Sequence, residues 1–408
     1  MVIYGMTVVF RVSRRSLLLI ALLVVVLFSS LFVCMFVNGY SAASLENTIR
    51  VKNETELKNA ISNASDGKST IIALDNDITL TTYDEGNYTY NYAVATLIIP
   101  ANKDITLITN KDSGFYKLIG AVNMPTVIIG AGGVLRLDGI IVTHKKGFTG
   151  CGVNVMGRTY IDSDGMLYLC NGEISGNTAN SVTGFGGGVV NDGIFTMSGG
   201  KISGNTAELG GGVYNEGNMQ YWGTFIMSGG EITGNTADFC GGGVYNTFYS
   251  KFIMSGGEIT GNTADNGGGV SMDHYSEFTM SGGKISGNTA FKQGGGVYSP
   301  HSSPFVMSGG TISGNAANEG GGVYVYGEFF DRHGGVISGN TATSGDNNVY
   351  LCSTGGGSSN GNNGQSVWNF DVKHVLVTCV IIIVAMGIAM ATLFVYFQKR
   401  INQVEKTK

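Results

Sequence analysis

Proline and charge are scarce in this 408-residue sequence, and each scarcity excludes a class of protein. Four prolines beside 65 glycines, without a Gly-X-Y period, exclude a collagen-like triple helix. Only 13% of the residues are charged, and 24 Lys and Arg stand against 29 Asp and Glu, so a nucleic-acid binder with clustered cations is excluded. The 43% share of hydrophobic residues excludes wholesale disorder.

Motifs for cofactors and metals are lacking too. The glycine runs are never followed by Lys-Ser/Thr, and no GxGxxG opens a helix, so no phosphate-binding loop is expected. The six cysteines form no CxxC or Cys-His pair with metal-ligand spacing, and we expect free, mostly buried thiols. We therefore predict no cofactor and no metal site.

Two uncharged hydrophobic runs flank the rest of the chain, at 16–37 and 375–397. A helix of about 22 residues is about 33 Å long, enough to cross a bilayer. Arg11, Arg14 and Arg15 precede the first run, and Lys399 and Arg400 follow the second. Because cations favour the cytoplasmic side, both termini should be cytoplasmic and the residues between should be extracellular. The small residues 41–43 offer a signal-peptide cleavage site, and cleavage there would remove the cytoplasmic N-terminal segment. Three N-glycosylation sequons, at Asn53, Asn63 and Asn87, agree with exposure outside the cell.

A repeat dominates the middle of the chain. The segment MSGGKISGNTA, which begins at Met197, recurs with small changes beginning at Met227, Met254, Met280 and Met307, with degenerate copies on both sides. Its isoleucines are 25 to 30 residues apart, and GGGV stands between the copies. Self-similarity with this period predicts stacked structural units.

Each unit reads as three short strands separated by glycine bends: GGGVYN, then Phe-x-Met-Ser-Gly-Gly, then x-Ile-Ser/Thr-Gly-Asn. Interior glycine disfavours helix by about 1 kcal/mol relative to alanine, and the Phe-x-Met alternation places two large side chains on one side of a strand. We therefore predict an all-β fold, a right-handed parallel β-helix with about 25–30 residues per coil. Stacking about 4.8 Å apart would place Phe on Phe, Met on Met and Ile on Ile, with an asparagine ladder at one bend.

The predicted organisation follows from this repeat and from the hydrophobic runs. Asn53 to Glu56 resemble a capping box, so a short helix should cap the N-terminal end of the solenoid, followed by strands in the first irregular coils. We expect these boundaries: a basic end with signal or anchor helix at 1–43, the cap and irregular coils at 44–164, regular coils at 165–352, a Gly/Ser/Asn tether at 353–374, a transmembrane helix at 375–397 and a basic cytoplasmic tail at 398–408.

The pairing of Ile-Ser-Gly-Asn with GGGVY over about residues 165–345 resembles the FxxN and GGAI repeats of polymorphic outer-membrane proteins and other β-helical, adhesin-like surface proteins. That resemblance implies the fold and suggests adhesion. The chain departs from those proteins because a single hydrophobic run, rather than a C-terminal autotransporter barrel, follows the repeats.

We accordingly expect a membrane-anchored, extracellular surface protein, either adhesin-like or structural, with glycans or surface proteins of another cell as partners. Contacts should come from the loops that break the repeat, at 216–222, 247–251, 273–277 and 298–303. The candidate ligand-contact residues are Tyr221, Trp222, Tyr249, His274, Tyr275 and His301.

The alternative is a carbohydrate-active β-helix enzyme, a polysaccharide lyase or hydrolase. Such a site needs acids that converge across neighbouring coils, and the two positions after each GGGV show no carboxylate column. The other candidates, at 162–164, 273–274 and 331–333, read as a turn, a solvated loop and a frayed end. We therefore predict no catalytic residues and no enzyme. The tyrosines that follow GGGV (Tyr214, Tyr245, Tyr298 and Tyr324) are expected to be buried and stacked rather than to bind sugars.

Overall fold

Parallel strands make up most of the computed structural model, which describes residues 48–81, 84–85, 94–95, 97–109, 114–158, 163–179, 184–300, 302–326 and 329–352. Within these residues one α-helix occurs, and no helix is long and apolar enough to span a bilayer. The predicted membrane runs at 16–37 and 375–397, the tether at 353–374 and the tail at 398–408 lie outside the described residues.

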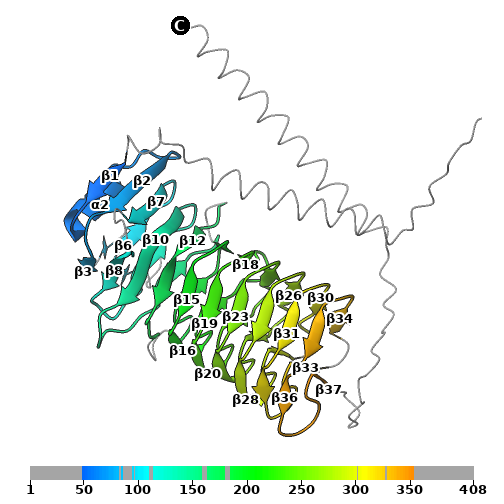
Figure 1. The fold of residues 1–408 in the computed structure, drawn as a ribbon. Helices are drawn as coiled ribbons and strands as arrows, with labels where there is room; N and C mark the ends of the chain where they lie inside the picture. Colours follow the sequence, from blue (N-terminus) through cyan, green and yellow to red (C-terminus); the bar gives the residue numbers. More distant parts are fainter. Residues whose placement is uncertain are drawn as a thin grey trace, which may run out of the picture. The chain divides into compact units, whose positions relative to one another are not determined.

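The strands form three parallel sheets and one antiparallel pair, β4 with β5. In the regular region, strands of successive coils lie side by side in sequence order (Figure 1). The largest sheet contains β1 (Ile49–Val51), β2 (Ser69–Leu74), β3 (Ile78–Leu80), β7 (Asp104–Thr109), β8 (Tyr116–Gly120), β10 (Val134–His144), β12 (Met166–Ser175), β14 (Ile194–Met197), β15 (Lys201–Ser203), β18 (Thr224–Met227), β19 (Glu231–Thr233), β22 (Lys251–Met254), β23 (Glu258–Thr260), β26 (Glu277–Met280), β27 (Lys284–Ser286), β30 (Phe305–Met307), β31 (Thr311–Ser313), β34 (Phe330–Arg332) and β35 (Val336–Ser338).

The second sheet has ten strands, which mark ten coils: β6 (Leu97–Ile99), β9 (Val127–Ile129), β11 (Val153–Val155), β13 (Val189–Asn191), β17 (Val213–Asn215), β21 (Val244–Asn246), β25 (Val270–Met272), β29 (Val297–Ser299), β33 (Val323–Tyr326) and β37 (Val349–Cys352). The third sheet has six: β16 (Thr206–Leu209), β20 (Thr236–Cys240), β24 (Thr263–Asn266), β28 (Thr289–Gln293), β32 (Ala316–Ala317) and β36 (Thr341–Ala342). The antiparallel pair is β4 (Asp84–Glu85) with β5 (Val94–Ala95). The parallel solenoid predicted from the repeat is confirmed.

Each regular coil has four strands rather than the three that we predicted. The two residues after each asparagine from Asn205 to Asn340, Thr-Ala in most coils, belong to the short strands of the third sheet, with Thr206 opposite Thr236 and Ala207 opposite Ala237. The inward-facing alanines are buried in every strand of this sheet except β36, whereas the threonines are half-buried or exposed. A four-residue strand with one small inward side chain gives little hydrophobic signal, which explains why the pattern did not reveal it.

The core consists of columns of identical side chains. Phe195, Phe225, Phe252, Phe278 and Phe305 are fully buried, and adjacent rings stack with centroids 4.6–4.8 Å apart and planes within 5°. Methionine pairs with methionine and isoleucine with isoleucine in the same registers. Each coil therefore shields the apolar surface of the next, which is the main stabilisation available to a solenoid.

A buried asparagine ladder runs along one corner of the coils, as predicted. In each step the backbone N–H and the side-chain Nδ2 of one asparagine donate to Oδ1 of the next, at 2.9–3.0 Å, from Asn177 through Asn205, Asn235, Asn262, Asn288 and Asn315 to Asn340. Two other side chains close the ladder: Nδ1 of His144 lies 2.9 Å from Oδ1 of Asn177, and Nδ2 of Asn340 donates to Oδ1 of Asn348 at 3.1 Å.

The predicted N-terminal helix is α2 (Glu54–Asn63), which packs against β1 and β3. Asn53 is its N-cap and accepts a hydrogen bond from the Glu56 N–H at 3.0 Å. Glu56 reaches back to the Lys52 N–H at 2.8 Å, one residue earlier than in the usual capping box. Leu57, Ala60 and Ile61 are buried, as the amphipathic pattern indicated.

Two smaller expectations are corrected. The segment 331–333, expected to be frayed, continues the solenoid, because β34 pairs with β30 and Phe330 stacks on Phe305 at 5.1 Å. The four described cysteines are free, but only Cys151 is buried, whereas Cys170, Cys240 and Cys352 are half-buried. Cys34 and Cys379 lie outside the described residues.

Candidate functional site

One corner of the solenoid varies from coil to coil. It links each strand of the ten-stranded sheet to the following strand of the largest sheet, through residues 192–193, 216–223, 247–250, 273–276 and 300–304. We call these segments the variable turns. The strands on both sides keep their register, so the variable turns of successive coils lie next to one another. Three of the four loops predicted to carry contacts begin in these turns, and the fourth begins with β29 and runs into the next turn.

An aromatic row runs across three variable turns. The ring of Trp222 meets Tyr249 edge-on at 6.2 Å, and Tyr249 stacks on Tyr275 at 5.4 Å. Phe248 and His274 form a second stack at 4.4 Å. Trp222, Phe248 and Tyr275 are exposed by 36%, 43% and 55%, so the rings are displayed to solvent rather than packed in a core. The structure thus brings four of the predicted residues, Trp222, Tyr249, His274 and Tyr275, to one place.

Two cations lie over rings of this cluster. The Lys251 ammonium is 4.6 Å from the ring centroid of Trp222, and the Arg158 guanidinium is 5.5 Å from that of Tyr221. Each cation also has a carboxylate partner, Glu277 at 3.5 Å for Lys251 and Asp164 at 2.9 Å for Arg158. Tyr221 was predicted as a ligand-contact residue from the sequence, whereas neither cation was. We define the turn cluster as Tyr221, Trp222, Phe248, Tyr249, His274 and Tyr275 with Lys251 and Arg158.

The backbone of the turn cluster is strained. Phe248, Tyr249, His274 and Tyr275 have φ of +46°, +55°, +47° and +61°, and Ser302 in the next turn has φ of +67°. Non-glycine residues avoid this left-handed region at a cost of roughly 1–2 kcal/mol each. Among the described residues one other non-glycine residue has positive φ, Asn102, whereas 27 glycines do. Side chains with no local reason to adopt this conformation are therefore concentrated in three adjacent turns.

Buried polar groups beneath the rings hold these turns in place. Nδ2 of Asn215 donates to Oδ1 of Asn246 at 2.6 Å and to the Lys251 carbonyl at 3.0 Å. The hydroxyls of Ser250 and Ser276 donate to Oδ1 and to the carbonyl of Asn246, both at 2.8 Å. The strain persists because the surrounding hydrogen bonds leave the turn backbone no alternative.

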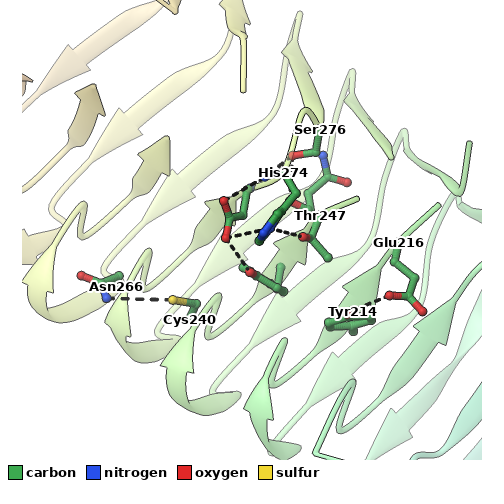
Figure 2. Close-up of polar contacts among 10 residues, drawn as sticks. Tyr214, Glu216, Cys240, Thr247, Asn266, His274 and Ser276 are labelled. Carbon is green, nitrogen blue, oxygen red and sulfur yellow. Dashed lines mark hydrogen bonds and ion pairs between the residues drawn. The ribbon is translucent and has the colours of Figure 1, made fainter. Parts of the chain in front are cut away.

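Figure 2 shows polar contacts around His274 together with the Tyr214–Glu216 contact. Asp273 accepts a hydrogen bond from its neighbour's backbone, the His274 N–H, at 2.8 Å, and Nδ1 of His274 lies 3.0 Å from Oδ2 of Asp273 and 3.4 Å from the Thr247 hydroxyl. The Tyr245 hydroxyl donates to the same carboxylate at 3.2 Å. Asp273 thus orients the imidazole that stacks on Phe248.

A pair of acids that sequence analysis missed lies at the same corner. Asp192 and Glu216 each follow an asparagine, and these asparagines, Asn191 and Asn215, are directly paired in adjacent coils. The Tyr214 hydroxyl donates to Oε2 of Glu216 at 2.8 Å. Burial raises the pKa of the Asp192 carboxyl well above its usual range, and the neighbouring Glu216 raises it further. The expectation of no carboxylate column holds for the two positions after GGGV, but the third position carries Asp192, Glu216 and, beyond Thr247, Asp273.

The tyrosine column under the turns is buried at Tyr214, Tyr245 and Tyr324, as expected, whereas Tyr298 is half-buried. Tyr214, Tyr245 and Tyr324 are exposed by 3–6%, and stacked or tilted rings link Tyr214 to Tyr245 and Tyr298 to Tyr324. Ser271 interrupts the column. Burial raises the pKa of Tyr298 to about 12 and raises those of Tyr214 and Tyr245, where the neighbouring carboxylates add to the effect. The Tyr214 hydroxyl therefore acts as a donor to Glu216, and the Tyr245 hydroxyl as a donor to Asp273.

Of the remaining predicted residues, His301 and Asn87 lie outside the described residues. Asn53 is the N-cap of α2, where its Nδ2 donates to Glu56 at 2.8 Å, and Asn63 is the last residue of that helix. Both are exposed. In the described part of the chain, no group of three or more His, Cys, Asp and Glu could hold a metal ion.

Comparison with known proteins yields no match: no family model, no curated protein and no solved structure is similar to this chain. Its site must therefore be interpreted from its own geometry.

Proposed function

We propose that this chain is a membrane-anchored surface protein whose solenoid binds a glycan or a protein of another cell through the turn cluster. One observation carries the proposal: five of the six described non-glycine residues with positive φ lie in three adjacent variable turns, and four of them carry rings. The neighbouring corners of the same coils use glycine where the backbone is left-handed. Strain concentrated at displayed aromatic side chains is a feature of binding sites.

The placement of the solenoid outside the cell rests on the sequence. The two hydrophobic runs with basic flanks are consistent with an anchored protein whose middle is extracellular. The repeat similarity to adhesin-like surface proteins agrees with this placement. Epitope tags at the two termini and in the exposed loop at 216–223 test it. In intact cells, antibodies should reach only the loop, and labelling of both termini would contradict the proposed topology.

The experiment for binding compares the full chain with a variant in which Trp222, Tyr249 and Tyr275 are replaced by alanine. We expect binding to whole cells and to a glycan array by the wild-type chain and loss of binding in the variant. A matched control replaces Phe239 and Phe291, which are exposed by 55% and 68% in β20 and β28, away from the variable turns. Equal binding by all three proteins would contradict the proposal.

A second candidate is glycoside hydrolysis, favoured specifically by the Asp192–Glu216 pair. A carboxyl with a raised pKa beside a second carboxylate is the combination that a general acid and its partner need. The Tyr214 hydroxyl would fix the orientation of Glu216. A reducing-sugar assay of the full chain on mixed polysaccharides tests this candidate. Release of reducing ends by the wild-type chain that is abolished by Glu216→Gln would favour the enzyme. If no reducing ends are released, glycoside hydrolysis is contradicted and binding is the one remaining function.

A further inference from the structure

The charge around the turn cluster is the first indication of what the site binds. The carboxyl groups within the cluster's contacts outnumber its permanent cations, which are Lys251 and Arg158. Those carboxyl groups belong to Asp164, Asp273 and Glu277. Both cations are already paired with carboxylates. An anionic ligand would therefore meet excess negative charge and no unpaired cation, whereas hydroxyl groups would meet acceptors.

The open ring face of Tyr275 is the second indication. One face of the ring stacks on Tyr249, and the corresponding position in the next turn, by strand register, is Ser302. No ring contact to Tyr275 occurs on that side among the described residues. The faces of Trp222 and Tyr221 lie under Lys251 and Arg158 instead. Among the described residues, Tyr275, exposed by 55%, thus offers an uncovered aromatic face next to the small polar side chain of Ser302.

The spacing of the row is the third indication. In the row of Trp222, Tyr249 and Tyr275, three successive coils supply one ring each, with centroids 6.2 and 5.4 Å apart. A linear polymer of rings can follow such a regular row. The C–H edges of a sugar ring carry partial positive charge and pack on the negative face of an aromatic ring.

We infer that the turn cluster binds an uncharged glycan, with one sugar ring stacked on the outer face of Tyr275 and hydroxyl groups donating to Asp273 and Glu277. This inference rests on the proposed binding function and specifies its ligand class. The carboxylates Asp273 and Glu277 are half-exposed and flank the row, so they can accept hydrogen bonds from solvent-facing hydroxyls. The same carboxylates select against uronate and sulfated glycans by repulsion.

The test uses the full chain on an array that carries neutral, uronate and sulfated glycans, followed by calorimetry with the glycans that bind. We expect neutral glycans to bind, and Tyr275→Ala to weaken their affinity about tenfold, because a stacked aromatic contact contributes on this scale. Phe291→Ala, outside the cluster, should leave the affinity unchanged. Binding should persist at about 1 M salt, where the Debye length is only about 3 Å and ionic contacts are screened.

Each outcome has a defined meaning. Tyr275-dependent binding of anionic glycans alone, or of a cell-surface protein with no neutral glycan bound, would overturn the ligand class and leave the proposed function standing. Binding to neither array nor cells, or binding that Tyr275→Ala does not weaken, would overturn the ligand class and the proposed function together.

Discussion

Each regular coil turns one corner at the buried asparagine, as between β15 and β16, and another at the variable turn, as between β21 and β22. The asparagine corner repeats the same chemistry seven times: glycine in the left-handed region, then an asparagine whose amide bonds to the next coil. The variable turn changes its length and its residues in almost every coil and places rings where the other corner has glycine. The comparison shows that one corner serves the stacking of coils, whereas the other is free to serve something outside the solenoid.

The two corners also differ in where their polar groups point. At the asparagine corner the donors and acceptors face inward and satisfy one another, so the corner has nothing to offer a ligand. At the variable turn, buried asparagines and serines fix the backbone from below while rings and carboxylates face solvent. A rigid base under exposed aromatic side chains reduces the entropy lost when a partner binds.

The largest effect should come from breaking the asparagine corner with Asn262→Ala. The substitution leaves the N–H and Nδ2 of Asn235 without their acceptor and removes one of the two donors to Oδ1 of Asn288, whose other donor is the backbone N–H of residue 262. Since each buried unsatisfied group costs about 1–3 kcal/mol, the free energy of unfolding should fall by more than about 3 kcal/mol in urea denaturation followed by circular dichroism. The matched control is Asn266→Ala in the same coil, a half-buried asparagine whose amide contacts Cys240, which should cost about 0.5 kcal/mol or less. Similar losses in both variants would show that the ladder has no special role.

A smaller effect is expected when a ring is introduced at the asparagine corner by Gly261→Phe. Gly261 is exposed with φ of +64°, and the nearest atom to an added Cβ is 3.9 Å away, so only the backbone conformation opposes the change. The unfolding free energy should fall by about 1–2 kcal/mol. Gly261→Asn should cost less, because asparagine tolerates the left-handed region. If Gly261→Phe leaves the unfolding free energy unchanged, this fold accepts left-handed aromatic residues without strain. The positive φ values in the variable turns would then be no sign of a binding site.

The reciprocal change gives the turn at 247–250 the residues that its conformation favours, through Phe248→Asn with Tyr249→Gly. Two consecutive residues with positive φ match the type I′ pattern, for which Asn-Gly is preferred. Relief of strain should offset the lost ring stacking, so the unfolding free energy should change by no more than about 1 kcal/mol. Binding to cells and glycans should nevertheless disappear. A large loss of stability would instead assign these rings to the architecture of the solenoid.

The smallest effect concerns Asp192 and depends on pH. Because its pKa is raised in the folded protein, the folded state retains a proton that the unfolded chain loses above about pH 3.9. The stability that this proton brings is fully present below that pH and is lost as pH rises through the folded pKa. Asp192→Asn should therefore raise the urea midpoint at pH 8 and leave it unchanged near pH 3. Asp238→Asn, at an exposed site in β20, serves as the control, and a gain for Asp192→Asn that does not depend on pH would contradict the assignment.

The architecture could be predicted from the sequence because the solenoid stacks identical side chains from equivalent positions of successive repeats. Phe252 lies on Phe278 and Ile259 on Ile285, so residues one sequence period apart are neighbours in adjacent coils. The short third sheet escaped prediction because Ala207 and its counterparts are too small to produce an alternation pattern.

The candidate site was predicted by elimination, as the place where the repeat breaks and aromatics remain. Trp222, Tyr249, His274 and Tyr275 were found in this way and do lie together. Asp192 and Glu216 were missed because they stand at the third position after GGGV, whereas only the first two positions were considered as a possible column of acids. The turns that separate them from the next acid also differ in length. The left-handed backbone at Phe248 and Tyr249 could not be predicted at all, since neither residue type signals it.

The closure of the ladder by His144 and Asn348 has a consequence for how this protein could change over generations. Neither His144 nor Asn348 is one of the repeated corner asparagines. The two ends of the ladder are therefore formed by residues outside the repeat. An extra coil inserted between Asn235 and Asn262 would find the same acceptor on one side and the same donors on the other. Duplication of a single repeat would therefore lengthen the solenoid without altering either terminus, and each added copy would supply another variable turn on which new side chains could be tried.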